Sequence, residues 1–247
     1  MIRAAVLLAL CVAAAPALAT DLPSGFVRLA DLAPHIAQDI RYARAFNFTG
    51  APVPGYDRES CILTETTARA LIRVETQLAQ QGYGLVVFDC YRPIRSVLVF
   101  ADWAAQSPAP PGGPPSQQTF FPDLARGDLI PLGYIARQSG HSVGHTVDVG
   151  LRRADQPPAR PDWADATACT AAFDQRYAET GLDLGTGFDC FSPLSAVAAD
   201  VTPEARKNRR ILTRAMQAQG FTGYAAEWWH FRNSADPARD RQDFPVN

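Results

Sequence analysis

The spacing of hydrophobic residues predicts an amphipathic helix over residues 64–81, ending before Gly82. Apolar side chains recur there every three or four residues, which places them on one helical face: Ala68, Leu71, Val74 and Leu78. Directly after it, residues 85–88 form a continuous apolar run that is typical of a buried strand. This arrangement puts Asp89 and Arg92 at the end of that strand.

A second helix is predicted by its boundary signals. Thr202 is a suitable N-cap, Pro203 occupies the first helical position, and Gly220 follows the last turn. The residues expected on its inner face are Ile211, Leu212, Ala215 and Met216.

Two further strands are predicted around the polar residues that carry the chemistry. Residues 146–151 alternate so that Thr146 and Asp148 share one face. The stretch that begins at Glu227 is the other strand. Glu227 and His230 are three residues apart and would point to opposite faces of a regular strand, so a bulge or the strand's end must intervene.

Two short stretches, SGHSVGHTVD and EWWH, contain a candidate metal site. His141, Asp148 and His230 offer two imidazoles and one carboxylate, a set that leaves a zinc ion one open position for water. Glu227 is close in sequence to the last ligand and can accept that water's proton. We therefore predict one Zn²⁺ per chain and a hydrolytic reaction.

His145 is the alternative ligand, because it follows His141 at the i, i+4 spacing of a helical zinc-binding pair. However, Ser142 stands where that motif needs a glutamate, and Gly144 disfavours a helix at this point. We therefore interpret His145 as a residue beside the site or at its rim.

The order Ser-x-His-x6-Asp, followed late in the chain by Glu-x-x-His, resembles the zinc peptidase superfamily of D-Ala-D-Ala carboxypeptidases, lysostaphin-type enzymes and hedgehog domains. Within it, the chain is most similar to the D-Ala-D-Ala dipeptidases. Besides the two metal stretches, the likeness includes residues 41–42, 47–50, 82–85, 89–93, 187–189 and 243–246.

The resemblance implies an α+β fold, a single domain in which a central, mainly antiparallel sheet carries the zinc site and is flanked by helices. It gives Arg92 the role of stabilising, with zinc, the oxyanion that forms when water attacks the peptide carbonyl. Asp189 would pair with the free ammonium of a small D,D-dipeptide. Ser139, Tyr42 and Asp89 would help to hold this substrate, although Asp89 and Arg92 also suit an ordinary ion pair.

Composition agrees with one enzyme domain over residues 20–247. Without the first 19 residues, 228 of the 247 remain, enough for one sizeable core. The net charge of −2 shows no basic excess of the kind that nucleic-acid or anionic-membrane binding needs, and no protein partner is implied.

Residues 1–19 have the pattern of a secretory signal peptide. A charged start at Arg3 precedes an apolar run over residues 4–15, and the small residues Ala17 and Ala19 suit a cut after Ala19. The run is too short to span a bilayer, and no transmembrane segment is expected later. A periplasmic or secreted protein is predicted.

Four cysteines follow the predicted cut, and an even number in an exported chain favours two disulfides. No Cys-x-x-Cys pair occurs, which argues against a thiolate metal site. Three connectivities are possible, and the pairing that we expect is Cys61 with Cys90 and Cys169 with Cys190.

Three functions compete. The first is hydrolysis of D-Ala-D-Ala to two D-alanines by metal-activated water. The second is a D,D-carboxypeptidase or murein endopeptidase that acts on peptidoglycan stem peptides. The third is a non-catalytic zinc module that acts through protein contacts, and the presence of Glu227 and Arg92 argues against it.

Overall fold

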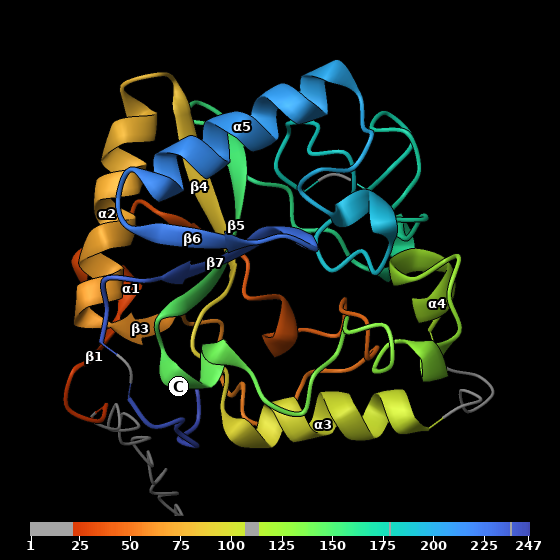
Figure 1. Cartoon of the computed structure of the whole chain (residues 1–247), viewed down its shortest axis with the longest axis horizontal. Coiled ribbons are helices and arrows are strands. Elements are labelled where there is room, and N and C mark those ends of the chain that lie inside the picture. The colour runs from red at the N-terminus through yellow and green to blue at the C-terminus, as the bar shows by residue number, and fades with distance from the viewer. Residues whose placement is uncertain (1–21, 107–113, 178, 238) are drawn as a thin grey trace, which may run out of the picture.

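The computed structural model describes residues 22–106, 114–177, 179–237 and 239–247 (Figure 1). The predicted signal peptide lies outside the described residues. Within them, no helix combines the length and apolar character needed to cross a membrane.

The centre of the molecule is a five-stranded sheet in the order β2-β4-β5-β7-β6. Only the short β2 pairs in parallel, with β4, and the other three pairings are antiparallel. The strands are β2 (Ala37–Gln38), β4 (Tyr83–Asp89), β5 (Thr146–Arg153), β6 (Phe221–Tyr224) and β7 (Glu227–Asn233). A separate antiparallel pair joins β1 (Phe26–Arg28) to β3 (Ile62–Thr64). The predicted α+β domain with a mainly antiparallel sheet is confirmed.

Helices flank the sheet. In Figure 1, α5 lies along the top edge and α3 along the bottom edge, with the strands between them. Both α2 and α5 pack against the sheet and against each other. The α-helices are α1 (Leu29–Leu32), α2 (Glu65–Ala79), α3 (Ile94–Ala105), α4 (Ser116–Phe120) and α5 (Pro203–Gln217). The 3-10 helices are η1 (Arg41–Ala43), η2 (Arg126–Asp128), η3 (Gly140–Val143), η4 (Trp163–Asp165) and η5 (Pro193–Ser195).

Both helices predicted from the sequence are present with the expected N-caps, although α2 ends at Ala79, two residues before its predicted end. The Thr64 side chain caps α2 by accepting the Thr67 N–H, and Thr202 caps α5 through the Ala205 N–H. Beyond α5, Gly220 has a φ of 87°, a left-handed conformation that glycine adopts without strain. The predicted strand at residues 85–88 is the buried centre of β4.

Two disulfides link segments next to the sheet. Cys61 pairs with Cys90, and Cys169 pairs with Cys190, so the expected connectivity is confirmed. The first joins the start of β3 to the end of β4, and the second anchors the loop that follows Phe188.

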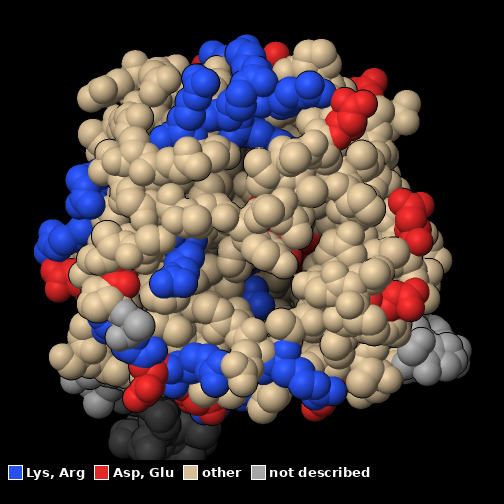
Figure 2. Space-filling model, in the orientation of Figure 1, with Lys and Arg blue, Asp and Glu red and all other residues tan. Residues whose placement is uncertain are grey.

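Charge is unevenly distributed over the face drawn in Figure 2, although the net charge is only −2. Lys and Arg side chains gather over α5, where Lys207, Arg210 and Arg214 line a surface pocket. The same face is hollowed near its centre, and charged side chains of both signs are visible inside the hollow.

Candidate metal centre and substrate cavity

Neighbouring strands bring the candidate metal ligands together. Asp148 on β5 is the register partner of His230 on β7 and, on its other side, of Asp89 at the end of β4. His141 enters from η3, where the Ser139 hydroxyl accepts its backbone N–H. Gly144, with a φ of 86°, then turns the chain into β5. The three ligands therefore depend on strand pairing and on one tight turn.

The candidate ligand atoms, one from each side chain, lie within 4.8 Å of one another, close enough to share one metal ion. Nε2 of His141 lies 3.3 Å from Nδ1 of His230 and 3.4 Å from Oδ2 of Asp148. Nδ1 of His230 lies 3.1 Å from Oδ1 of Asp148. Tetrahedral zinc with bonds of about 2.0–2.1 Å places its ligand atoms about 3.3 Å apart. Among the described residues, this is the group of His, Cys, Asp and Glu side chains whose geometry suits a metal ion.

The hydrogen bonds around the cluster also suit a cation. Nδ1 of His141 donates to the carbonyl oxygen of Cys90 at 2.6 Å, which directs the lone pair of Nε2 toward His230 and Asp148. The buried Oδ1 of Asp148 has no hydrogen-bond partner among the described residues, despite the nearby His230 ring. Burial opposes ionisation of Asp148, but His141 and His230 hold its pKa below the usual value. These residues fit a bound zinc ion.

His145 lies outside this cluster. Its Nδ1 is 3.1 Å from the Thr146 hydroxyl, and its side chain does not line the cavity. Burial lowers its pKa, so the neutral imidazole is favoured. This placement agrees with the interpretation of His145 as a neighbour of the site.

Glu227 reaches the site because β7 departs from regular pairing. The register with β6 jumps from Gly223 opposite Phe231 to Tyr224 opposite Glu227, and this is the irregularity expected from the sequence. As a result, an oxygen of Glu227 lies 3.5 Å from Nδ1 of His230. Burial raises the pKa of Glu227 to about 7, with His230 opposing the shift and Asp148 adding to it.

Arg92 is fixed beside the cluster by Asp89. Its Nε and Nη2 both donate to Oδ2 of Asp89, at 3.0 and 2.8 Å, while the Tyr56 hydroxyl donates to Oδ1 at 2.6 Å. The guanidinium also lies 3.8 Å from Asp148. Arg92 lines the cavity but Asp89, which is fully buried, does not. The sequence showed no local signal for Tyr56.

Asp189 lies in the same cavity. The Tyr42 hydroxyl donates to Oδ2 of Asp189 at 2.8 Å. Burial, reinforced by the charge of Asp148, raises the pKa of Asp189 well above its usual value. Its φ of 58° is the only positive value of a non-glycine residue in the described part of the chain. Burial therefore favours the neutral carboxyl group, and a nearby cation would favour its ionised form.

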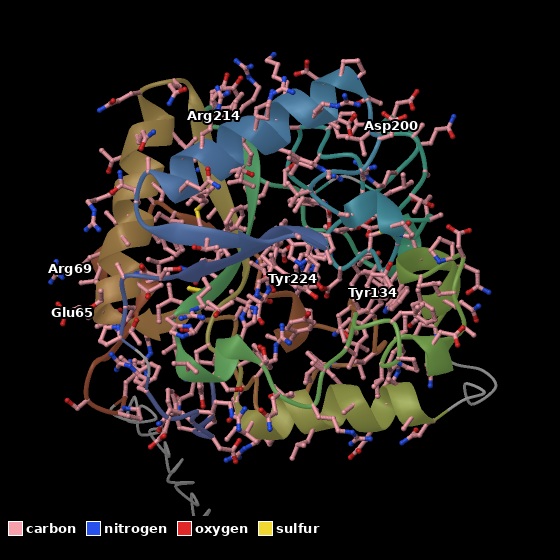
Figure 3. All side chains as sticks on the ribbon, in the orientation of Figure 1. Glu65, Arg69, Tyr134, Asp200, Arg214 and Tyr224 are labelled. Carbon is pink, nitrogen blue, oxygen red and sulfur yellow. A yellow bond between two sulfur atoms is a disulfide. The ribbon has the colours of Figure 1, made fainter. Side chains whose placement is uncertain are left out.

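The cavity is small, with a volume of about 220 Å³. That is below the range of about 300–1,000 Å³ for drug-sized ligands. Tyr134 and Tyr224, neither of which the sequence indicated, also line it, and in Figure 3 they lie where Figure 2 shows the hollow. The predicted site residues that line it are Tyr42, Arg92, Ser139, His141, Asp148, Asp189, Glu227 and His230.

This arrangement, together with the similarity to known proteins, defines the protein as a metallopeptidase. The chain belongs to the D-ala-D-ala dipeptidase family, whose family model matches residues 23–159 and 156–246. The resemblance inferred from the motifs is therefore confirmed.

Curated relatives agree with this family. A D-alanyl-D-alanine dipeptidase from Enterococcus faecium is 33% identical over 224 residues, which cover 90% of this chain and 98% of the relative. One from Streptomyces coelicolor is 34% identical over 223 residues, with the same coverage. A third, from Escherichia coli, is 29% identical over 208 residues and covers 83% of this chain and 82% of the relative.

Proposed function

We propose that this protein is a zinc-dependent dipeptidase that hydrolyses D-Ala-D-Ala to two molecules of D-alanine. The names of its relatives support this substrate. The observation that carries the proposal is that a small cavity contains both the metal cluster and the buried carboxyl group of Asp189. This cavity offers a site for the scissile bond and one for the substrate's ammonium group.

His141, Asp148 and His230 would hold the zinc ion. A bound zinc ion supplies Lewis acidity, which makes water a better nucleophile and polarises the peptide carbonyl. Glu227 accepts the proton of the attacking water and later returns it to the leaving amine. Burial raises the pKa of Glu227 above its usual value and so favours uptake of a proton from the attacking water.

Arg92 stabilises the negative charge that develops on the carbonyl oxygen. Asp89 and Tyr56 hold its guanidinium in place before the substrate arrives, so little reorganisation is needed during the reaction. We therefore assign Asp89 to positioning Arg92 rather than to direct contact with the substrate.

Asp189 and Tyr42 bind the free ammonium of the dipeptide. Arrival of this cation favours the ionised carboxylate of Asp189, which is otherwise destabilised by burial. Ser139 contributes a polar group to the cavity wall.

We place the reaction outside the cytoplasm. The two disulfides are compatible with an oxidising compartment, and residues 1–19 have the pattern of a signal peptide with a cut after Ala19. The most natural role there is recovery of D-alanine from peptides released during wall turnover.

The decisive experiment compares free D-Ala-D-Ala with N-acetyl-D-Ala-D-Ala and with a stem pentapeptide that ends in D-Ala-D-Ala. Capping the ammonium leaves Asp189 unpaired in its buried site, at a cost of about 3–5 kcal/mol, or roughly a hundredfold to several thousandfold in kcat/KM. Comparable turnover of the capped substrate or the pentapeptide would replace this proposal with the carboxypeptidase function.

A further inference from the structure

Arg41, Asp39 and Glu179 form a buried cluster of charges next to the residues of the candidate ammonium pocket, and the proposed mechanism does not use it. Arg41 is fully buried, and its Nη2 donates to Oδ2 of Asp39 and to Oε1 of Glu179, each at 2.9 Å. Neither Arg41 nor Glu179 lines the cavity. Burying such charges is costly, so their arrangement calls for an explanation beyond general packing.

Glu179 extends this ion pair to the main chain of the next segment. Its second oxygen, Oε2, accepts the backbone N–H of Phe188 at 2.9 Å. The Phe188 ring stacks on Phe88 of β4 with centroids 4.5 Å apart, and the Arg41 guanidinium lies 5.5 and 5.7 Å from these two rings. Phe188 is therefore held through both its backbone and its ring.

Asp189 lies between two anchored neighbours. Phe188 precedes it, and Cys190, which is disulfide-bonded to Cys169, follows it. Its left-handed backbone conformation costs free energy and persists only where the surrounding structure enforces it. This conformation is part of what directs the Asp189 carboxyl group toward the hydroxyl of Tyr42.

Consecutive residues of η1 thus act on Asp189 by two routes. Tyr42 binds its carboxyl group directly, whereas Arg41 acts through Glu179 on the backbone of Phe188. Loss of the second route would leave the metal ligands in place, because they belong to η3, β5 and β7. It would loosen the turn that carries Asp189, because the Phe188 N–H would lose its ionised acceptor.

We propose that Glu179, held by Arg41, is a positioning residue that sets the geometry of Asp189 and thereby the selectivity for peptides with a free N-terminal ammonium. This inference rests on the proposed function, in which Asp189 binds that ammonium. A displacement of about 1 Å at such a contact is enough to lower kcat/KM by about a hundredfold.

The test is Glu179→Gln, which keeps the shape of the side chain but removes its charge toward Arg41. We expect kcat/KM for D-Ala-D-Ala to fall about ten- to a hundredfold, mainly through KM, with zinc content unchanged. Cleavage of N-acetyl-D-Ala-D-Ala, which lacks the ammonium, should stay at its wild-type rate. The preference for the free dipeptide should therefore shrink by the same factor.

The matched control is Glu75→Gln. Glu75 is also a buried glutamate that accepts a backbone N–H, from Leu85 at 2.6 Å, and lies near an arginine, Arg152. It does not line the cavity, so its substitution should leave KM and the substrate preference unchanged. A similar change of KM in both variants, or an equal loss on both substrates, would overturn the positioning role.

Two further variants decide the remaining cases. If Glu179→Gln does not fold, Arg41→Lys takes its place as the test. Arg41→Lys keeps the positive charge but lacks the forked guanidinium, and it should also raise KM for D-Ala-D-Ala. In the double variant, adding Glu179→Gln to Asp189→Asn should cause no further loss. If Asp189→Asn alone keeps wild-type KM, the proposed function fails and this inference with it. If Asp189→Asn impairs binding while Glu179→Gln does not, only this inference fails.

Discussion

Nδ1 of His141 donates a hydrogen bond to the main-chain oxygen of Cys90, which is itself disulfide-bonded to Cys61. The candidate ligand is thus oriented by a residue that immediately follows β4. A histidine whose second nitrogen is held in this way presents a fixed tautomer and ring direction to a metal.

Removing this disulfide should weaken zinc binding. The Cys61→Ser, Cys90→Ser double variant loosens the carbonyl that orients His141, and we expect about tenfold weaker zinc affinity in a competition titration with a chelator. The matched control is Cys169→Ser with Cys190→Ser, since the two disulfides have similar separations of 29 and 21 residues and each should contribute about 3 kcal/mol of stability. Equal zinc affinity in both double variants would contradict the prediction.

Glu227 should be needed for proton transfer but not for metal binding. Glu227→Gln should retain near-stoichiometric zinc and lose about 10²- to 10⁴-fold in kcat, because an amide accepts no proton from water. His141→Ala or His230→Ala should instead lose the zinc itself. Metal analysis and steady-state kinetics on the same preparations separate these roles, and near-normal activity of Glu227→Gln would rule out the mechanism.

His145 should be dispensable for metal binding. Its ring faces Thr146, so His145→Ala should still fold and bind one zinc, whereas Asp148→Ala should bind much less. Elemental analysis after dialysis gives the answer. A zinc-free His145→Ala protein beside a loaded Asp148→Ala protein would show that the ligand set is wrong.

Arg92 should act mainly on the chemical step. Arg92→Lys cannot reproduce the two donations to Asp89, so the cation loses its fixed position and kcat should fall about 10²- to 10³-fold. Tyr56→Phe removes only the hydrogen bond to the other oxygen of Asp89 and should cause a smaller fall in kcat. The prediction fails if Arg92→Lys changes only KM.

Glu75 should make stability depend on pH. Burial raises the pKa of Glu75 above about 4.5, the value in the unfolded chain. Above about pH 4.5, Glu75 is therefore protonated to a greater extent in the folded protein than in the unfolded chain. Its contribution to stability is therefore lost as pH rises through the folded pKa. As pH rises through this range, the free energy of unfolding of wild type should fall relative to that of Glu75→Gln, whose amide does not titrate. Urea unfolding of both proteins at each pH measures this difference. A constant difference would contradict the prediction.

Local sequence signals predicted α2, α5 and the strands that carry Asp148 and His230, but not η3, which carries His141. The caps at Thr64 and Thr202 and the apolar periodicity of both helices depend on neighbouring residues, so the sequence displays them directly. Glu227 and His230 are three residues apart and would point to opposite faces of a regular strand, and this spacing predicted the irregular pairing of β7. Strand β2 has two residues and is too short to show any periodicity.

Long-range contacts were not predictable in the same way. Tyr56 is 33 positions before the Asp89 that it binds, and no spacing rule connects them. The same holds for Arg41 and Glu179, which are 138 positions apart. Net charge likewise averages over the chain, so it concealed the gathering of arginines over α5.

Asp148 and His230 are register partners, so if they hold the proposed zinc ion, metal content should measure correct folding. A slip of one residue between β5 and β7 would turn one side chain of the pair to the other face of the sheet and separate the ligands. The zinc ion that we propose would bind across these strands and would act as a reversible cross-link that closes a long segment of the chain. Variants far from the cavity that disturb this register should therefore show a reduced metal content before other defects are detected.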